Sequence, residues 1–373
     1  MPRSSRRLAA LFAAAACGAG ATGCGGSSGD DGGGGGGSGG GGGEGGKIAF
    51  LLPESKTARY ESQDKPRFIA NVKRLCPKCE VLYANASQDA AKQQQQADSF
   101  LTQGAKVLVL DAVDVTSAAS IANKARQTGV KVVSYGRLVA EAPLDYYVSI
   151  DPYKVGRQQA DALLAALKAK GVTSPRVVMI NGAPTDSNAA PYKRGALDVL
   201  KAAGAKVVRE YDTPDWSPDK AQTQMSGAIT ALGKDGFDAV YVANDGMAGG
   251  AITAMRSAGV SSRERPVTGQ DAEVAGLQRV VEGTQLMTVY QDIPKLAKAA
   301  AELAVPLAQG KAPPDIARDR TDNGAGEIPS VLIPTIAIDK KNMESVIFKD
   351  GFATAKQVCT EDFAEACAAA GLN

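Results

Sequence analysis

The chain has 373 residues, of which 44% are hydrophobic and 22% are charged, a globular composition with enough length for two domains. Its 42 Lys and Arg against 40 Asp and Glu leave a formal net charge of +2, which gives no strong field to attract a nucleic acid. Histidine is absent, which removes the commonest general base and the commonest metal ligand. These features argue against an enzyme, and we expect no catalytic residue, no cofactor and no metal site.

The N-terminal segment, residues 1–24, is predicted to be a lipoprotein signal peptide. Basic residues up to Arg7 precede a short apolar stretch at residues 8–16, which is far too short to span a bilayer. The segment ends in Ala21-Thr22-Gly23-Cys24, which resembles a bacterial lipobox, the motif whose Cys becomes lipid-modified. Cys17 is a weaker second candidate, and cleavage without lipidation is the alternative.

Residues 25–46 are almost entirely Gly, with Ser and a few acidic residues, a composition typical of a flexible tether. A lipid on Cys24, this tether and a folded part from Lys47 onward would place the protein outside the cytoplasm. No later segment approaches the roughly 18 continuous apolar residues of a membrane-spanning helix. We therefore expect the protein to contact the membrane only through the lipid anchor.

Four further cysteines fit an oxidising compartment: Cys76, Cys79, Cys359 and Cys367. A four-thiolate zinc site usually pairs two closely spaced motifs, and the second spacing here is wide. A thioredoxin-like redox role would place Cys-Pro-Lys-Cys at a strand-to-helix junction, whereas here a helix precedes it and a strand follows. We predict two local structural disulfides, Cys76–Cys79 and Cys359–Cys367.

Beyond Lys47, short hydrophobic stretches alternate with longer amphipathic ones. The predicted strands are Ile48–Leu52, Val81–Ala84, Val107–Leu110, Lys131–Ser134, Tyr146–Ile150, Arg176–Ile180, Lys206–Val208, Ala239–Ala243, Val267–Thr268 and Met287–Tyr290. Predicted helices between them include Gln88–Thr102, Ser117–Thr128, Val155–Lys170, Pro218–Leu232 and Met247–Gly259. Buried strands that alternate with helices predict an α/β protein with two doubly wound parallel sheets side by side.

Ligands of such sheets bind beyond the carboxyl ends of the strands, where the residues of this chain are unusually polar. Arg137 follows a strand of the first set, and Asn244 and Asp271 follow strands of the second. Planar charged groups form paired hydrogen bonds with neighbouring hydroxyls, and aromatic rings cover the C–H face of a sugar. The pattern indicates a small polyhydroxylated ligand. Asp245 is predicted instead to be the N-cap of the helix from Met247.

Several motifs occur in order between Lys47 and Thr354. They include Lys-Ile-Ala-Phe at 47, Ser-Tyr-Gly-Arg-Leu at 134, Asp-Tyr-Tyr-Val-Ser-Ile-Asp at 145, Gly-Ala-Pro-Thr-Asp-Ser-Asn-Ala at 182, Ala-Asn-Asp-Gly-Met-Ala-Gly-Gly-Ala-Ile at 243 and Gly-Gln-Asp-Ala-Glu-Val-Ala-Gly at 269. With these motifs the chain resembles the periplasmic xylose-binding protein family, type I sugar solute-binding proteins of ABC importers.

The resemblance implies the type I periplasmic binding protein fold, in which two lobes close over the ligand about a hinge that the chain crosses three times. We expect the crossings near Ile150–Pro152, Val289–Asp292 and Leu332–Thr335. The N-terminal lobe would comprise residues 47–150 plus 291–332. The C-terminal lobe would comprise residues 151–290 plus 333–373.

The resemblance also implies the sugar-binding residues. They are Arg59, Tyr60, Arg137, Asn188, Trp216, Asn244, Asp271 and Gln291, with the two aromatic rings sandwiching the sugar. The chain departs from the xylose pattern at two positions, because Gly136-Arg137 replaces the family's Asp-Arg and Gln291 replaces a Lys. An anion and a cation are lost together, so the charge balance of the site is kept.

We therefore expect a monomeric, extracytoplasmic lipoprotein that delivers a monosaccharide, xylose or a related aldose, to an ABC permease in the membrane. The alternative is a sugar or autoinducer-like sensor that presents its closed form to a membrane receptor. A related DNA-binding repressor is excluded, because a signal peptide and tether stand where its helix-turn-helix would be. The residues at the strand ends include no positioned nucleophile–base pair, which argues against an enzyme.

Overall fold

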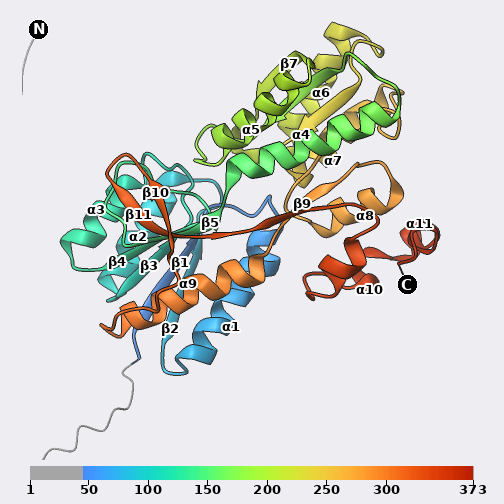
Figure 1. Ribbon diagram of the computed structural model, residues 1–373. Coiled ribbons are helices and arrows are strands. Elements are labelled where there is room, and N and C mark those ends of the chain that lie inside the picture. Colours follow the sequence, from blue (N-terminus) through green and yellow to red (C-terminus); the bar gives the residue numbers. More distant parts are fainter. Residues whose placement is uncertain (1–44, 373) are drawn as a thin grey trace, which may run out of the picture. The chain divides into compact units, whose positions relative to one another are not determined.

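The computed structural model describes residues 45–372, so the predicted signal peptide, Cys24 and most of the tether lie outside the described residues. Figure 1 shows that the described chain is built around two separate groups of strands. We call the part around the larger sheet the first lobe and the part around the other strands the second lobe.

The first lobe contains a seven-stranded sheet in the order β10-β11-β5-β4-β3-β1-β2. Its strands are β1 (Lys47–Leu52), β2 (Glu80–Asn85), β3 (Val107–Leu110), β4 (Lys131–Tyr135), β5 (Tyr146–Ile150), β10 (Asp319–Asp322) and β11 (Glu327–Ile333). All neighbouring pairs are parallel except β10 with β11. The carboxyl ends of the parallel strands therefore gather at one edge of the sheet.

Both faces of this sheet are covered, because alternate residues of β1 enter two different hydrophobic clusters. Ile48 and Phe50 pack with the side that carries α1 (Lys65–Leu75) and α9 (Ile293–Ala308). Ala49 and Leu51 pack with the side of α2 (Ala90–Thr102) and α3 (Ala119–Gln127). Such two-sided burial explains why the strands are continuously hydrophobic.

The second lobe contains a parallel sheet in the order β7-β6-β8. Its elements are β6 (Arg176–Asn181), β7 (Lys206–Asp212), β8 (Ala239–Val242), α4 (Pro152–Ala169), α5 (Ala189–Ala202), the 3-10 turn η2 (Pro214–Trp216), α6 (Pro218–Leu232), α7 (Asp245–Ser257) and α8 (Val274–Glu282). Helices α4 and α5 pack on each other, as do α6 and α7 (Figure 1). A separate antiparallel pair joins β9 (Thr288–Gln291) to β12 (Thr335–Ile338).

The C-terminal segment consists of short helical pieces after β12. These are η3 (Glu344–Phe348), α10 (Ala355–Val358), η4 (Glu361–Phe363) and α11 (Ala364–Ala369). The structure contains a Cys359–Cys367 disulfide here and a Cys76–Cys79 disulfide between α1 and β2. No helix within residues 45–372 is both long enough and apolar enough to cross a membrane.

The parallel strands lie close to where the hydrophobic stretches predict them, but two features differ. The predicted strand Val267–Thr268 is only a single bridge between Val267 and Val240. The strands β10, β11 and β12 were not predicted. β10 is the wholly polar sequence Asp-Arg-Thr-Asp at a sheet edge, and β11 contains Pro329. Edge strands lack the two-sided burial that makes a strand recognisable from its hydrophobicity.

The described chain passes between the two lobes at three points, each between consecutive elements. Asp151 separates β5 from α4, Asp292 separates β9 from α9, and Pro334 separates β11 from β12. All three connections are a single residue long. The carboxyl ends of the strands in both lobes lead to these connections or to the polar loops beside them.

Candidate functional site

One cavity is lined by residues of both lobes and has a volume of about 30 Å³. All eight residues that the sequence predicts as sugar contacts line it: Arg59, Tyr60, Arg137, Asn188, Trp216, Asn244, Asp271 and Gln291. Five further residues complete the lining: Thr57, Gly136, Asp186, Tyr192 and Gln270. The cavity is therefore the candidate site.

A chain of contacts across the cavity joins Arg59, Gln291 and Asp271. Arg59 Nη1 donates to Gln291 Oε1 at 3.3 Å, and Gln291 Nε2 donates to Asp271 Oδ1 at 3.0 Å. The same Asp271 oxygen lies 3.8 Å from Arg59 Nε. Burial raises the pKa of Asp271, and the Arg59 charge opposes this rise. Gln291 thus connects the two charges as a neutral group that both accepts and donates.

A second set of contacts centres on Asp186, which the sequence did not single out. Its Oδ2 forms an ion pair with Arg137 Nε at 2.8 Å and accepts a hydrogen bond from Trp216 Nε1 at 3.2 Å. Arg137 is fully inside the protein and also donates from Nη1 to the Ala112 carbonyl at 2.9 Å. The Arg137 guanidinium is therefore fixed by groups on two sides.

The aromatic residues lie in defined contacts as well. The Arg59 guanidinium is 4.8 Å from the Tyr60 ring centroid, a cation–π geometry. Trp216 packs edge-on against Tyr192, with the ring centroids 6.3 Å apart. A Cβ on Gly182 would lie 2.1 Å from the Trp216 ring, so the indole fits closely over the end of β6. These contacts fix both rings in the wall of the cavity.

Asn244 has a structural role that the sequence interpretation gave to its neighbour. Asn244 is the N-cap of α7 and accepts from the amide of Met247 at 3.0 Å. The prediction that Asp245 is the N-cap is wrong, because Asp245 is already in the first helical turn and points inward. There its carboxylate accepts from Gln285 Nε2 at 2.6 Å and from Thr288 Oγ1 at 2.9 Å.

Left-handed backbone conformations of non-glycine residues occur around the cavity. Asp215 and Trp216 have φ of 62° and 52°, and Asp271 and Ala272 have φ of 91° and 50°. Such conformations are costly for L-residues and concentrate at functional sites, where the surrounding structure holds them in place. They turn the Trp216 and Asp271 side chains toward the cavity, a feature with no sequence signal.

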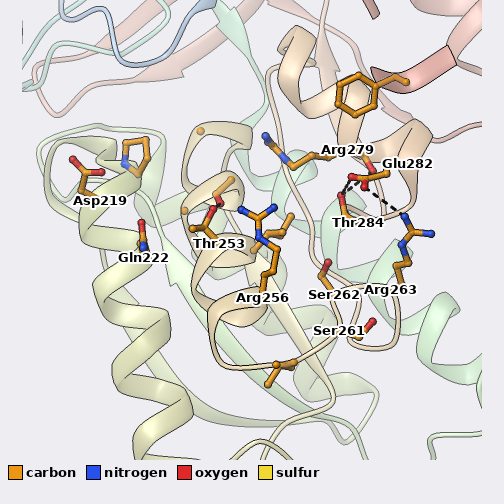
Figure 2. Close-up of a pocket in the computed structure, with 18 residues that line it drawn as sticks. Asp219, Gln222, Thr253, Arg256, Ser261, Ser262, Arg263, Arg279, Glu282 and Thr284 are labelled. Atoms are coloured by element: carbon orange, nitrogen blue, oxygen red, sulfur yellow. Dashed lines mark hydrogen bonds and ion pairs between the residues drawn. The ribbon is translucent and has the colours of Figure 1, made fainter. Parts of the chain in front are cut away.

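A larger cavity of about 840 Å³ lies within the second lobe between α6, α7 and α8. Figure 2 shows Arg256, Arg263 and Arg279 around it, with Arg263 next to Glu282 at 3.5 Å. None of the eight predicted contacts lines this cavity. Although it is larger, this cavity is a weaker candidate than the small one, because its lining does not combine aromatic rings and polar side chains from both lobes.

Acidic residues near the small cavity do not form a metal centre. No group of three or more His, Cys, Asp or Glu within residues 45–372 is placed to hold a metal ion. The carboxylates of the site are instead interleaved with the two buried arginines. Such an arrangement suits a neutral ligand with many hydroxyl groups.

Residues 48–312 match the family model described as periplasmic binding protein domain. The chain belongs to this family. Two relatives, each named D-xylose-binding periplasmic protein, share 34% and 35% sequence identity with this chain. The first is from Escherichia coli strain K12 and the second is from Haemophilus influenzae. The first alignment covers 82% of this chain and 90% of the relative, and the second covers 84% and 92%.

Solved structures of periplasmic binding proteins agree with this relationship. An ABC transporter solute-binding protein from Clostridium phytofermentans, with bound β-D-glucose, matches with a TM-score of 0.75 and 26% identity. A carbohydrate transporter solute-binding protein from Chloroflexus aurantiacus, in complex with D-glucose, matches with a TM-score of 0.74 and 28% identity. The matches cover 84% and 83% of this chain and 99% and 97% of those proteins. The type I periplasmic binding protein fold is thereby established.

Proposed function

We propose that this protein is the extracytoplasmic substrate-binding lipoprotein of a sugar ABC importer. Its ligand is a monosaccharide, a xylose-like pentose or a related aldose. The observation that carries the proposal is the convergence of two buried arginines, two aromatic rings and several amide and carboxylate groups on one cavity between the lobes. Xylose-binding relatives and glucose-bound structural neighbours support the same ligand class.

In the proposed site, Arg59 and Arg137 donate hydrogen bonds to the sugar hydroxyls, and Asp271 accepts hydrogen bonds from the sugar hydroxyls. Asn188, Asn244 and Gln291 supply further donors and acceptors. Tyr60 and Trp216 cover the C–H faces of the sugar ring. A neutral sugar keeps the charges of the site paired within the protein, so its binding does not require a counter-ion.

Entry of the sugar requires the lobes to separate, because residues of both lobes line the cavity and its volume of about 30 Å³ is only about that of one water molecule in the liquid. We propose that the single-residue connections at Asp151, Asp292 and Pro334 act as the hinge, with residues 47–150 plus 293–333 moving against residues 152–291 plus 335–372. These bounds differ from those expected from the sequence, because Gln291 pairs with Thr335 in the second lobe and Ile333 pairs with Ile150 in the first. The closed form then docks on the permease. No chemical step is part of this cycle.

Attachment to the membrane is proposed to use a lipid on Cys24, with the Gly-rich residues 25–46 as the tether and the monomeric protein outside the cytoplasm. A Cys24→Ser variant tests the anchor. Wild-type protein should sediment with membranes and the variant should remain in the supernatant. Equal sedimentation of both proteins would contradict lipidation at Cys24.

The ligand is tested by a thermal-shift screen of the purified protein against xylose, glucose, galactose, arabinose and ribose, followed by calorimetric titration. A ligand that binds only the native state stabilises it by about 2.7 kcal/mol at a hundredfold excess over Kd. A clear shift with one or two sugars is expected. The proposal fails if none of the sugars shifts the unfolding temperature or binds in the titration.

A further inference from the structure

Gly136, the residue after β4, lies where a side chain would be strained and would collide with Asp111. Its φ of 66° lies in the left-handed region, and a Cβ placed there would be 2.4 Å from Asp111 Oδ2. The peptide cannot move away easily, because the Gly136 carbonyl accepts from Tyr147 Oη at 3.1 Å and Ser149 Oγ at 2.6 Å. The Asp111 carboxyl group therefore occupies the space that a side chain at position 136 would take.

Asp111 itself comes directly after β3 and is completely buried. Both backbone groups of Asp111 are hydrogen-bonded. Its amide donates to the Leu51 carbonyl at 3.0 Å, and its carbonyl accepts from Gln93 Nε2 at 2.8 Å. Both carboxyl oxygens, by contrast, lack a hydrogen-bond partner among the described residues. Buried polar groups in native proteins are nearly always hydrogen-bonded, so these two oxygens require an explanation.

The surroundings of Asp111 place it at the candidate site. Gly136 lines the cavity, and Arg137 Nε lies 3.7 Å from Asp111 Oδ1. Burial raises the pKa of Asp111 well above its usual range, and the charge of Arg137 opposes the rise. The carboxyl group therefore stands behind the one cavity residue that has no side chain to screen it.

We propose that Asp111 is a specificity-determining residue of the sugar site, whose carboxyl group binds a ligand hydroxyl through the gap left by Gly136. This inference rests on the proposed sugar-binding function. It explains why glycine stands where the family resemblance leads one to expect Asp, because the carboxyl group reaches the site from the end of β3 instead of β4. Arg137 then forms the second half of the hydroxyl-binding pair.

The isosteric variant Asp111→Asn tests the proposal, with Asp161→Asn, an exposed residue of α4, as the matched control. Calorimetric titration with the best sugar of the panel should show Asp111→Asn binding at least tenfold more weakly. Asp161→Asn should bind as the wild type does. The sugar-free unfolding temperature of Asp111→Asn should change little, because the carboxyl accepts no protein hydrogen bond and only its 3.7 Å ion pair with Arg137 is lost.

Deoxy analogues of the same sugar distinguish a direct contact from a structural effect. One analogue, which lacks the hydroxyl bound by Asp111, should bind wild type weakly and lose little further affinity in Asp111→Asn. The other analogues should lose as much affinity on mutation as the parent sugar. A uniform loss across all analogues would overturn the proposal, since a merely structural residue would weaken every ligand alike.

Relocation of the carboxyl group provides a second test. The double variant Asp111→Ala/Gly136→Asp frees the space at position 111 and restores an acid at position 136, which Asp tolerates better than most residues at positive φ. It should bind more tightly than Asp111→Ala alone and rank the sugars of the panel differently from wild type. Unchanged affinity of Asp111→Asn, with tight wild-type binding, would overturn this inference alone. A wild type that binds no sugar would overturn the proposed function as well.

Discussion

Arg137 of the first lobe and Asp186 of the second form an ion pair across the candidate cavity, with Nε 2.8 Å from Oδ2. Backbone contacts reinforce this connection, because Val115 donates its amide to the Thr185 carbonyl at 3.1 Å and Leu138 donates to Ser187 Oγ at 2.8 Å. The loop that follows β6 therefore meets the loops after β3 and β4 directly. In the proposed function, Arg137 therefore serves both ligand binding and lobe closure.

Replacement of Arg137 should weaken sugar binding through both of these roles. We expect Arg137→Ala to raise Kd at least tenfold, which corresponds to about 1.4 kcal/mol. Arg137→Lys should also bind weakly, because an ammonium group lacks the planar fork that reaches Asp186 and the Ala112 carbonyl together. Calorimetric titration checks both variants, and wild-type affinity in either would show that the guanidinium is not a ligand contact.

Removal of the Asp271 carboxylate should have a comparable effect from the second lobe. Asp271→Ala is expected to raise Kd at least tenfold, about 1.4 kcal/mol, because the sugar loses an acceptor and Arg59 keeps only Asp64 as a neighbouring counter-charge. The fold should persist, so far-ultraviolet circular dichroism should match wild type. Unchanged affinity would place the sugar away from this wall of the cavity.

Gln291→Lys tests why this chain carries an amide at that position. The Gln291 side chain accepts from Arg59 and donates to Asp271, whereas a Lys ammonium would face the Arg59 charge and could accept nothing. We expect about a tenfold loss of affinity that depends little on salt, because both groups are buried and ions screen buried charges weakly. Equal or tighter binding by Gln291→Lys would show that Arg59 moves away from position 291 when the sugar is bound.

Glu273 is expected to make stability depend on pH. Its Oε1 accepts from the amide of Ala58 across the lobes at 2.9 Å, and burial, with a contribution from Asp245, raises the pKa of Glu273 from 4.5 to about 8. Between these two pKa values, Glu273 keeps its proton in the folded protein and has released it in the unfolded chain. The contribution of Glu273 is therefore present at low pH and is lost as the pH rises from about 4.5 toward 8.

Glu273→Gln keeps an acceptor for Ala58 but does not titrate. The unfolding temperature of wild type should fall more between about pH 5 and about pH 8 than that of Glu273→Gln. Differential scanning calorimetry at constant ionic strength measures the two slopes. Parallel slopes would mean that Glu273 titrates at its ordinary pKa in the folded protein.

Much of the sheet architecture follows from sequence, because two-sided burial leaves continuous hydrophobic stretches such as Val107–Leu110. The positions of Arg137, Asn244 and Asp271 directly after strands also predict that each lies beyond the carboxyl edge of the sheet in its own lobe, since strands of parallel sheets end on one side. The polar edge strand β10 gives no such signal. The hydrophobic stretches in the sequence therefore indicate which strands are buried, and not which residues have a high strand propensity.

The parts of the site that sequence did not predict depend on backbone detail. Asp186 is one of several polar residues in the loop after β6, and only the path of that loop shows which one turns to Arg137. Whether Asn244 or Asp245 is the N-cap depends on where helix α7 begins, which residue types alone leave open to within one position. Asp111 becomes meaningful only beside Gly136, a residue of another strand end.

The steric conflict between positions 111 and 136 fixes the order in which evolution can exchange them. A lineage that carries a side chain at 136 has to acquire glycine there before it can accept Asp111, because a Cβ and the carboxyl group compete for one volume. The return route must begin at 111 for the same reason. On the proposed role of Asp111, each route passes through a protein with neither acid, which we expect to bind sugar weakly.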